Sequence, residues 1–364
     1  MTNPPFRADQ VGSLLRPADI KKARGDFAAN KITADELHEI EDEAISRAIA
    51  KQEEIGLHGV TDGEYRRAFF NYDFIEDLGG VDMTDTEMPF GDGKAKGKLL
   101  NVTGKLHFAG HPMLEHFKFL NAHTHETAKW TIPSPSMVHF RFGRKCVSES
   151  VYPDMDAFFD DVAATFGDAI NAFAKAGCKY LQIDECPMIF LTDPVHRKTL
   201  ADRGDDPDEA IRIYADIINR AAKRRPAGMT VSLHVCRGNY RSTHAATGSY
   251  ATIAEHLFQG IDVDAFFLEY DTDRAGGFEP LELVPDDKMV VLGLVTSKTP
   301  ELESKDAVKR RIEEATKYVP LERLALSPQC GFASTEEGNA LTEDEQWAKL
   351  GLVVDIARDV WGTA

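Results

Sequence analysis

Four residues in the second half of the chain carry side chains that suit one zinc ion. They are His234 and Cys236 in "SLHVCRGN", Glu269 in "FFLEYD" and Cys330 in "LSPQCGF". His234 and Cys236 are two residues apart, so on a β-strand both side chains point to the same face. Nitrogen, thiolate and carboxylate are the donors that Zn²⁺ takes in proteins. Two thiolates and one carboxylate indicate thiol chemistry, because zinc removes the proton of a thiol whose pKa is otherwise about 8.5.

The other cysteines have simpler interpretations. The five cysteines of the chain are scattered and odd in number, which does not predict a disulfide framework. Cys146 and Cys178 are interpreted as small buried hydrophobic residues. For Cys186, directly after "IDE", packing and metal binding both stay open. Core packing also competes with ligation for the four candidate ligands, since no short zinc motif covers donors spread over so long a stretch.

Each candidate ligand stands near the C-terminal end of a short apolar run that predicts a buried strand. Eight such runs occur, at residues 10–16, 58–64, 128–135, 179–185, 229–236, 264–270, 289–295 and 323–330. Most are too hydrophobic for half-exposed antiparallel strands and fit a parallel sheet buried on both faces. Helix starts lie between them: a capping box at Thr33 and Glu36, a proline-initiated helix at Asp206, and starts at Thr299 and Thr342.

This alternation predicts an α/β fold, a (β/α)₈ TIM barrel. The alternative, an open doubly wound sheet, needs a glycine-rich phosphate turn after the first strand, and "VGSLLRP" is not one. The 364 residues exceed the roughly 250 that are typical of such barrels. The extra length falls at residues 79–123, where "GDGKAKGK" is turn-rich and "KLLNVTGKLHFAG" alternates like a hairpin. We therefore predict one catalytic barrel over residues 1–364, with this insertion between strands 2 and 3 and over the barrel mouth.

The net charge of −18, from 60 acidic and 42 basic residues, argues against nucleic acid and anionic membranes as partners. No run approaches the roughly 20 apolar residues of a membrane span, and "MTNPPFRADQVGS" lacks a signal-peptide core. We expect a cytoplasmic enzyme with small-molecule partners, for which a homodimer is compatible with a single barrel.

The order of these motifs resembles the catalytic barrel of cobalamin-independent methionine synthase. Besides His-x-Cys, Glu and Cys-Gly, "VGSLLRP" resembles that family's "IGS" segment, "TDGEYRR" its Gly-Glu segment and "LQIDEC" its Ile-Asp-Glu segment. The matches keep their order from about residue 7 to 335. The resemblance implies a zinc-dependent methyl transfer to a thiol, most simply that of homocysteine, to give methionine.

The resemblance also implies roles for individual residues. The zinc ligands would be His234, Cys236, Glu269 and Cys330, with Glu269 as the labile ligand that moves away when the substrate sulfur binds. Ser13, Glu64 and Asp184 would hold the amino acid, its amino group especially, and Asp184 joins Glu269 as a candidate catalytic residue. For Glu64 and Asp184 the alternative role is ion pairing with Arg66, Arg237 or Arg241.

The chain also departs from the family pattern. Where the family has a histidine in "IHSP" that protonates the departing folate, this chain has "LVTSKTPE", with Lys298 as a general acid, an anion ligand or a solvated lysine. The family's folate-stacking aromatic residue has no match in this chain, although Trp130 and Phe140 lie nearby in the sequence. The family enzyme is roughly twice as long, with a second barrel. The methyl or alkyl donor therefore stays open, and an epoxyalkane:coenzyme M transferase-like or O-demethylase-like enzyme and a non-catalytic zinc- or thiol-binding protein remain alternatives. Uroporphyrinogen decarboxylase, another barrel relative, fits these metal-binding strand ends poorly.

Overall fold

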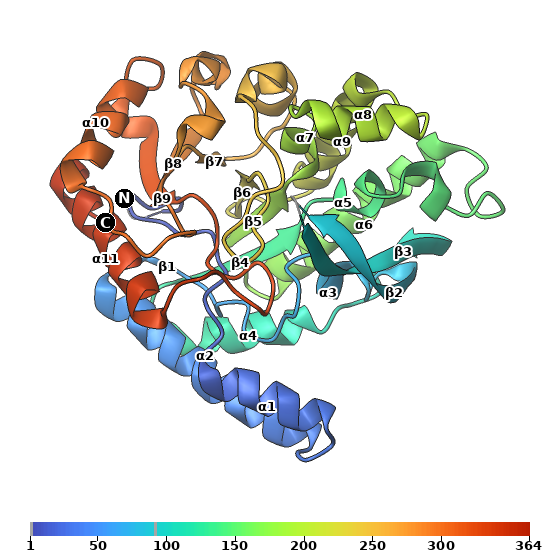
Figure 1. Ribbon diagram of the computed structural model, residues 1–364, viewed down its shortest axis with the longest axis horizontal. Helices are drawn as coiled ribbons and strands as arrows, with labels where there is room; N and C mark the ends of the chain where they lie inside the picture. Colours follow the sequence, from blue (N-terminus) through green and yellow to red (C-terminus); the bar gives the residue numbers. More distant parts are fainter. Residues whose placement is uncertain (1–2, 91–92) are drawn as a thin grey trace.

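The main sheet is parallel and curls into a barrel with helices around its outside, in a computed structural model that describes residues 3–90 and 93–364 (Figure 1). The strand order is β1-β4-β5-β6-β7-β8-β9, so successive strands along the chain are neighbours. The seven strands are β1 (Gly59–Val60), β4 (Thr127–Pro133), β5 (Tyr180–Glu185), β6 (Thr230–Val235), β7 (Ala265–Glu269), β8 (Met289–Val295) and β9 (Leu324–Pro328). The architecture confirms the predicted (β/α)₈ barrel.

The predicted first strand at residues 10–16 is wrong. The N-terminal segment pairs with the sheet through a bridge between Ala8 and Leu326 of β9, two residues earlier than expected. Beyond that bridge, Gln10 reaches the sheet through its side-chain amide, which lies 3.3 Å from the Gly59 carbonyl of β1. The segment therefore closes the barrel partly by side chains, which the apolar pattern of the sequence does not reveal.

Most predicted helix starts are confirmed. Thr33 and Thr342 cap α2 and α11 through capping boxes, and Asp206 caps α9. The predicted start at Thr299 is wrong, because α10 begins only after Ser304. The α-helices are α1 (Ala18–Ala28), α2 (Ala34–Ile55), α3 (Tyr72–Ile75), α4 (Met113–His123), α5 (Met137–Phe140), α6 (Met155–Lys175), α7 (Pro187–Phe190), α8 (Pro194–Asp202), α9 (Pro207–Ala222), α10 (Lys305–Ala315) and α11 (Glu343–Trp361).

Short helical turns replace full helices after β6 and after β7. The 3₁₀ turns of the chain are η1 (Gly143–Cys146), η2 (Tyr250–Thr252), η4 (Asp273–Ala275), η5 (Glu279–Leu283) and η6 (Leu321–Arg323), and η3 (Glu255–Gln259) is a π turn. Within the described ranges, no helix is both long and apolar enough to cross a bilayer.

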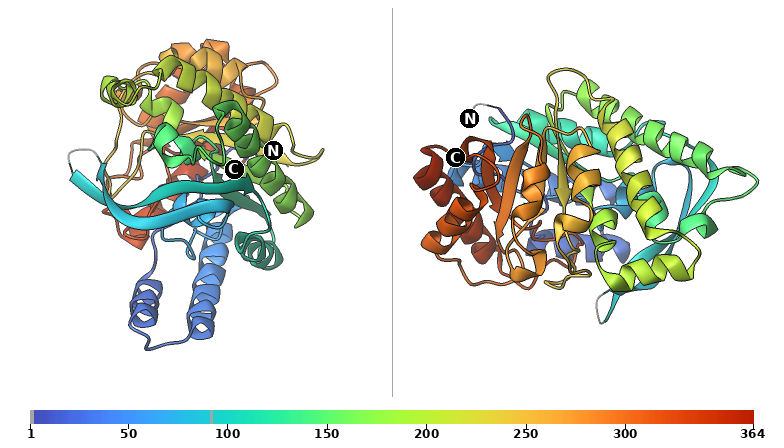
Figure 2. Two further views of the ribbon diagram at one scale, coloured as in Figure 1. Left: turned by 90° about the vertical axis from the view of Figure 1, so that its right-hand side faces the viewer. Right: turned by 90° about the horizontal axis from the view of Figure 1, so that it is seen from above.

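The predicted hairpin insertion is confirmed. Strands β2 (Gly79–Phe90) and β3 (Gly93–His107) pair antiparallel between barrel strands β1 and β4, and lie across one side of the barrel (Figure 2). Of the stretch expected to be turn-rich and irregular, residues 93–98 belong instead to β3, while residues 91–92 lie outside the described part of the chain. The hairpin brings Met88 and Ala95 to the cavity described below.

Alternation along the barrel strands sets which side chains face inward. On β5 and β6, Asp184 stands in register with His234. Because side chains alternate along a strand, residues two apart share a face, and the residue after each strand end continues toward the barrel mouth. Parallel strands bring these C-terminal ends to one edge, where catalytic residues of such barrels gather.

Candidate active site

Three of the four predicted zinc ligands come together at the ends of β6 and β9. The ligand atoms of His234, Cys236 and Cys330 all lie within 4.8 Å of one another, and all three residues are buried. The Sγ atoms of Cys236 and Cys330 are 3.6 Å apart. The sequence predicted this convergence from strand ends alone.

His234 is oriented as a metal-binding histidine would be. Its Nδ1 lies 3.0 Å from Oδ1 of Asp184, while its buried Nε2 has no hydrogen-bond partner among the described residues. In zinc sites, a carboxylate commonly holds one imidazole nitrogen of a ligand histidine in this way and leaves the other nitrogen free for the metal. Burial lowers the pKa of His234, but the contacts with Asp184 and Cys330 outweigh burial and raise the pKa to about 10. Without a metal, both ring nitrogens therefore carry a proton at neutral pH.

The two thiols support the same conclusion. Contact with Cys186 and burial raise the pKa of Cys236 well above the usual thiol value, and contact with Cys236 and burial do the same for Cys330. Buried sulfurs this close cannot all ionise without a nearby positive charge. A divalent cation that binds sulfur ligands, such as Zn²⁺, supplies that charge, so the donor set fits the predicted metal.

Glu269 ends β7 as predicted, but it does not lie in this group. Its Oε1 accepts hydrogen bonds from Arg274 Nη2 at 2.7 Å and Nε at 3.1 Å, and its Oε2 accepts one from the Arg237 backbone N–H at 3.1 Å. Burial raises the pKa of Glu269, but Arg237, Lys298 and Arg274 outweigh it, so the pKa is lowered and the group is ionised. The protein's own cations neutralise this carboxylate, and its role as a ligand stays a prediction.

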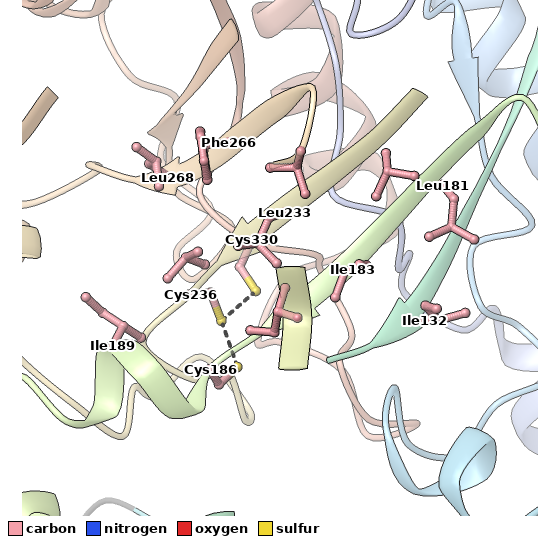
Figure 3. Packing of buried hydrophobic residues seen from close by; sticks show 14 of the residues in the cluster. Ile132, Leu181, Ile183, Cys186, Ile189, Leu233, Cys236, Phe266, Leu268 and Cys330 are labelled. Atoms are coloured by element: carbon pink, nitrogen blue, oxygen red, sulfur yellow. Dashed lines mark hydrogen bonds between the residues drawn. The ribbon is translucent and has the colours of Figure 1, made fainter. Parts of the chain in front are cut away.

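Cys186 is closer to the group than the sequence indicated. Its Sγ lies 3.8 Å from that of Cys236, and Figure 3 shows the Cys236 sulfur in contact with both Cys330 and Cys186. Cys146 and Cys178 instead contact backbone carbonyls, as expected of structural thiols. The signal for Cys186 in the sequence is its position one residue past a predicted strand.

One cavity opens directly onto the group of thiols. It holds about 920 Å³ of empty space, counting the part open to solvent, and the three candidate ligands and Cys186 line it. The predicted substrate residues Ser13, Glu64 and Asp184 line the same cavity. The two predicted sets of residues, for metal and for amino acid, therefore share one site. Aromatic and hairpin residues form much of the remaining wall, among them Phe69, Phe70, Tyr72, Met88, Ala95, Phe140 and Phe190.

Glu64 presents a carboxylate oxygen that the described residues leave unpaired. Its Oε1 accepts a hydrogen bond from Thr131 at 2.7 Å and lies 3.6 Å from Arg67, but its buried Oε2 has no partner among them. Burial, aided by the nearby charge of Asp184, raises the pKa of Glu64 despite Arg67. Glu64 also has φ 59°, a conformation that costs energy for a non-glycine residue and that concentrates at functional sites.

The alternative ion pairs do not form among the described residues. Arg66 pairs with Glu41 and Asp42 rather than with Glu64 or Asp184. Arg237 donates instead to Glu269, from its backbone N–H to the carboxylate and from Nη1 to the backbone carbonyl. Glu64 does pair with Arg67, which the sequence did not indicate. Glu64 and Asp184 therefore line the cavity without an ion pair to Arg66 or Arg237.

Ser13 packs against the loop that follows Cys330. Its Oγ accepts a hydrogen bond from the Ala333 N–H at 3.3 Å. A Cβ on Gly331 would lie 2.0 Å from the Ser13 Oγ and 3.2 Å from the Ser13 Cβ, so a larger residue beside Cys330 would displace the Ser13 side chain. The Cys-Gly pair of the sequence is thus explained by this close approach.

Lys298 is neither solvated nor on the cavity wall. Its Nζ donates hydrogen bonds to the Gly238 carbonyl at 3.3 Å, to Oδ1 of Asn239 at 3.0 Å and to the Thr243 carbonyl at 3.1 Å. It therefore holds the loop after Cys236. Asn239, which the sequence did not single out, lines the cavity and bonds the Gly331 carbonyl at 2.8 Å.

Phe140 and Trp130 take different places. Phe140 lines the cavity, with its ring 5.7 Å from that of Phe190. Trp130 is buried behind the wall against Phe117 and does not line the cavity. Arg141, next to Phe140, was missed by sequence reasoning: it lines the cavity, and its Nε has no hydrogen-bond partner among the described residues.

A parallel barrel with a His-Cys-Cys group that could hold a metal ion, beside two carboxylates on one cavity wall, is the architecture of a class of barrel enzymes with their site at the C-terminal strand ends. A family model described as the catalytic domain of cobalamin-independent synthase matches residues 6–359. The chain therefore belongs to the cobalamin-independent methionine synthase family.

Individual relatives agree. The uncharacterized protein YxjH of Bacillus subtilis (strain 168) is 48% identical over 361 residues, 98% of this chain and 95% of YxjH. A crystal structure from Listeria monocytogenes, of a protein proposed to be a vitamin-B12-independent methionine synthase, is 39% identical with a TM-score of 0.78 and full coverage of both chains. A B12-independent methionine synthase from Shewanella sp. W3-18-1, solved with selenomethionine, has a TM-score of 0.73 over 97% of each chain. At 20% identity, this last match shows the fold alone.

Proposed function

We propose that this protein is a zinc-dependent methyltransferase that transfers a methyl group to a thiol, homocysteine in the first place, to give methionine. The observation that carries the proposal is the juxtaposition of a His-Cys-Cys group with the acidic residues Glu64 and Asp184 on one cavity wall. The first set fits a metal that binds sulfur, and the second fits an ammonium group. Homocysteine carries both a thiol for the metal and an ammonium group for the carboxylates.

Zinc held by His234, Cys236 and Cys330 would lower the pKa of a bound thiol, so that the sulfur is a nucleophilic thiolate at neutral pH. With two thiolate donors, the site keeps electron density on the substrate sulfur, whereas a site rich in neutral histidines favours water activation. Asp184 fixes the His234 ring through Nδ1 and leaves Nε2 free. Because all three ligands open onto the cavity, the arrangement favours a catalytic site over a closed structural one.

The remaining residues orient the substrate. The free Oε2 of Glu64 can accept a hydrogen bond from the ammonium group, and Asp184 adds negative charge beside it. Ser13 and the loop at Gly331 close the wall next to Cys330. Bound in place of the ammonium group, the sulfonate of coenzyme M would lie against the carboxylates of Glu64 and Asp184, which disfavours it as the acceptor thiol.

The donor enters from the aromatic side of the cavity. Phe140 and Phe190 offer flat apolar surface there, and Arg141 offers a cation for an anionic donor. The buried Lys298 holds a loop, so the proton that a departing donor needs comes from another group or from water.

The test is a comparison of acceptor thiols with zinc-loaded protein. Homocysteine and coenzyme M are each incubated with a panel of methyl donors, methyl-folates and methyl-corrinoids, and with epoxides, and the alkylated thiol is identified by mass spectrometry. The proposal expects methionine from homocysteine and a methyl donor. Alkylated coenzyme M from an epoxide, without methionine, would establish the alternative transferase. Tight zinc with no alkylation of either thiol would indicate a non-catalytic site.

A further inference from the structure

The Glu64 carboxylate is held from behind by two buried residues that do not line the cavity. They are Thr131 of β4 and Arg67, which follows Glu64 by three residues. We infer that Arg67 and Thr131 are positioning residues that fix Glu64 so that its Oε2 stays free for a ligand, and that they make the site selective for ligands with an ammonium group. The inference rests on the proposed role of Glu64 and extends it to the residues that hold Glu64.

The Thr131 hydroxyl carries the first step. It donates a hydrogen bond to Oε1 of Glu64 at 2.7 Å and accepts one from Nη1 of Arg67 at 3.0 Å. A hydroxyl has one proton to donate, so the bond from Arg67 directs that proton to Glu64. Oε1 of Glu64 is thereby occupied, while Oε2 has no partner among the described residues. One oxygen of the carboxylate is held, and the other is available to a ligand.

The Arg67 guanidinium carries the second step. It also donates through Nη2 to the Thr131 carbonyl at 2.9 Å, so two hydrogen bonds join it to one residue. Its Cζ lies 4.9 Å from the centroid of the Trp130 ring, which adds a cation–π contact. The planar fork of arginine makes such two-point contacts, which the single ammonium group of lysine cannot reproduce. Arg67 is thus fixed with its positive charge 3.6 Å from Oε1 of Glu64.

Close packing around Thr131 carries the third step. A Cβ on Gly12, where φ is 142°, would lie 2.7 Å from the Thr131 methyl carbon and 3.4 Å from Oε1 of Glu64. The Gly12 backbone therefore lies against both side chains, and the β-branched Thr131 has few χ1 rotamers in any case. Glu64 itself has φ 59°, a strained conformation that persists only where the surroundings hold it. The carboxylate is therefore pre-organised for its ligand.

The environment of Glu64 explains the selectivity. Burial raises the pKa of Glu64, the charges of Arg67 and Arg16 lower it, and the charge of Asp184 raises it. A ligand ammonium group pairs the free Oε2 and stabilises the ionised carboxylate. A ligand without that group leaves a buried polar atom unpaired, and sites built to hydrogen-bond one group discriminate strongly against analogues that lack it.

Isothermal titration calorimetry of the zinc-loaded full chain measures this selectivity without methyl transfer. The probes are L-methionine and 4-(methylthio)butanoate, which has the same thioether and carboxylate but no ammonium group. We expect the wild type to bind methionine roughly 10- to 150-fold more tightly than the analogue. Equal binding of the two probes by the wild type, or no binding of methionine, would overturn the inference.

Variants of Thr131 separate positioning from packing. Thr131→Val keeps the shape of the side chain without the hydroxyl, so we expect it to lose most of the preference for methionine. Thr131→Ser restores the hydroxyl and should restore the preference. If Thr131→Val shows no cooperative thermal unfolding, Arg67→Lys replaces it, because that variant keeps the charge, lacks the fork and should lose most of the preference too. Wild-type preference in Thr131→Val or in Arg67→Lys would overturn the inference.

Thr165→Val is the matched control. Thr165 is also buried, but its hydroxyl bonds the Asp161 carbonyl at 2.6 Å within α6, and the residue does not line the cavity. We expect this variant to keep the preference of the wild type. Loss of the preference in Thr131→Val, together with no methionine formation by the wild type, would support this inference while refuting the proposed function. The two therefore fail separately.

Discussion

Replacing Glu64 by glutamine separates substrate binding from stability. Glu64 lines the cavity with an unpaired Oε2, while its Oε1 is held by Thr131 and Arg67. In Glu64→Gln the shape is kept, but the ammonium group of homocysteine loses a charged acceptor. A hydrogen bond to a charged group contributes about 1.5–3 kcal/mol. We therefore expect the KM for homocysteine to rise by roughly 10- to 150-fold, with the zinc content unchanged.

The same substitution should not destabilise the fold. Burial raises the pKa of Glu64 above the 4.5 of a free glutamate, so the folded state binds the proton more tightly than the unfolded state. Wild-type stability therefore falls as the pH rises from about 4.5 toward the raised pKa. The glutamine variant lacks this loss, so its advantage in stability is largest at neutral pH and vanishes in acid.

The assay combines homocysteine kinetics with thermal unfolding at several pH values. Glu41→Gln is the matched control, because Glu41 is also buried but pairs with Arg66 at 3.1 Å away from the cavity. That variant should lose stability and keep the KM of the wild type. An unchanged KM in Glu64→Gln, or a rise equal to that in Glu41→Gln, would refute the assignment of Glu64 to the substrate ammonium.

Four further substitutions test other parts of the site. Cys330→Ser should lose most of the bound zinc and the activity, whereas retained metal by elemental analysis would remove Cys330 from the site. Asp184→Asn should weaken zinc binding by roughly 10- to 100-fold in a chelator competition, because Asp184 orients His234; unchanged affinity would contradict this role. Burial raises the pKa of Glu185 to about 7, so the free energy of unfolding of the wild type should fall as the pH rises from 4.5 to 7. Glu185→Gln should remove that slope in denaturant titrations, and a slope that persists would show that Glu185 does not cause it. Arg141→Gln should raise the KM of an anionic donor about tenfold and leave that of homocysteine unchanged; equal effects on both would indicate a structural role.

Strand periodicity made much of the site predictable. His-x-Cys on a strand must point both side chains one way, and parallel strands must bring their C-terminal ends together, so the convergence of His234, Cys236 and Cys330 follows from the apolar pattern. The alternation in residues 79–123 likewise predicted the hairpin. The resemblance to a known family added Ser13, Glu64 and Asp184, which all reach the same cavity.

The rest depends on contacts that no local pattern records. The ion pair of Glu269 with Arg274 requires the loop after β7 to fold back on the strand end, and nothing in "EYDTDRAGG" indicates that direction. The sequence around Lys298 indicates an exposed lysine, yet the residue is buried and its Nζ donates to three acceptors of a distant loop. The N-terminal segment resembles a strand by its apolar residues but is held by a single backbone bridge to β9 and by side chains such as Gln10. In each case tertiary partners decide the outcome.

The central claim is that a metal-bound thiol accepts the methyl group in this cavity. The most direct measurement is methionine formation by chelator-treated protein, before and after one equivalent of Zn²⁺ is restored, with homocysteine and the methyl donor found active in the panel. We predict no methionine from the metal-free protein and full recovery with zinc. Equal methionine formation without metal would contradict the account.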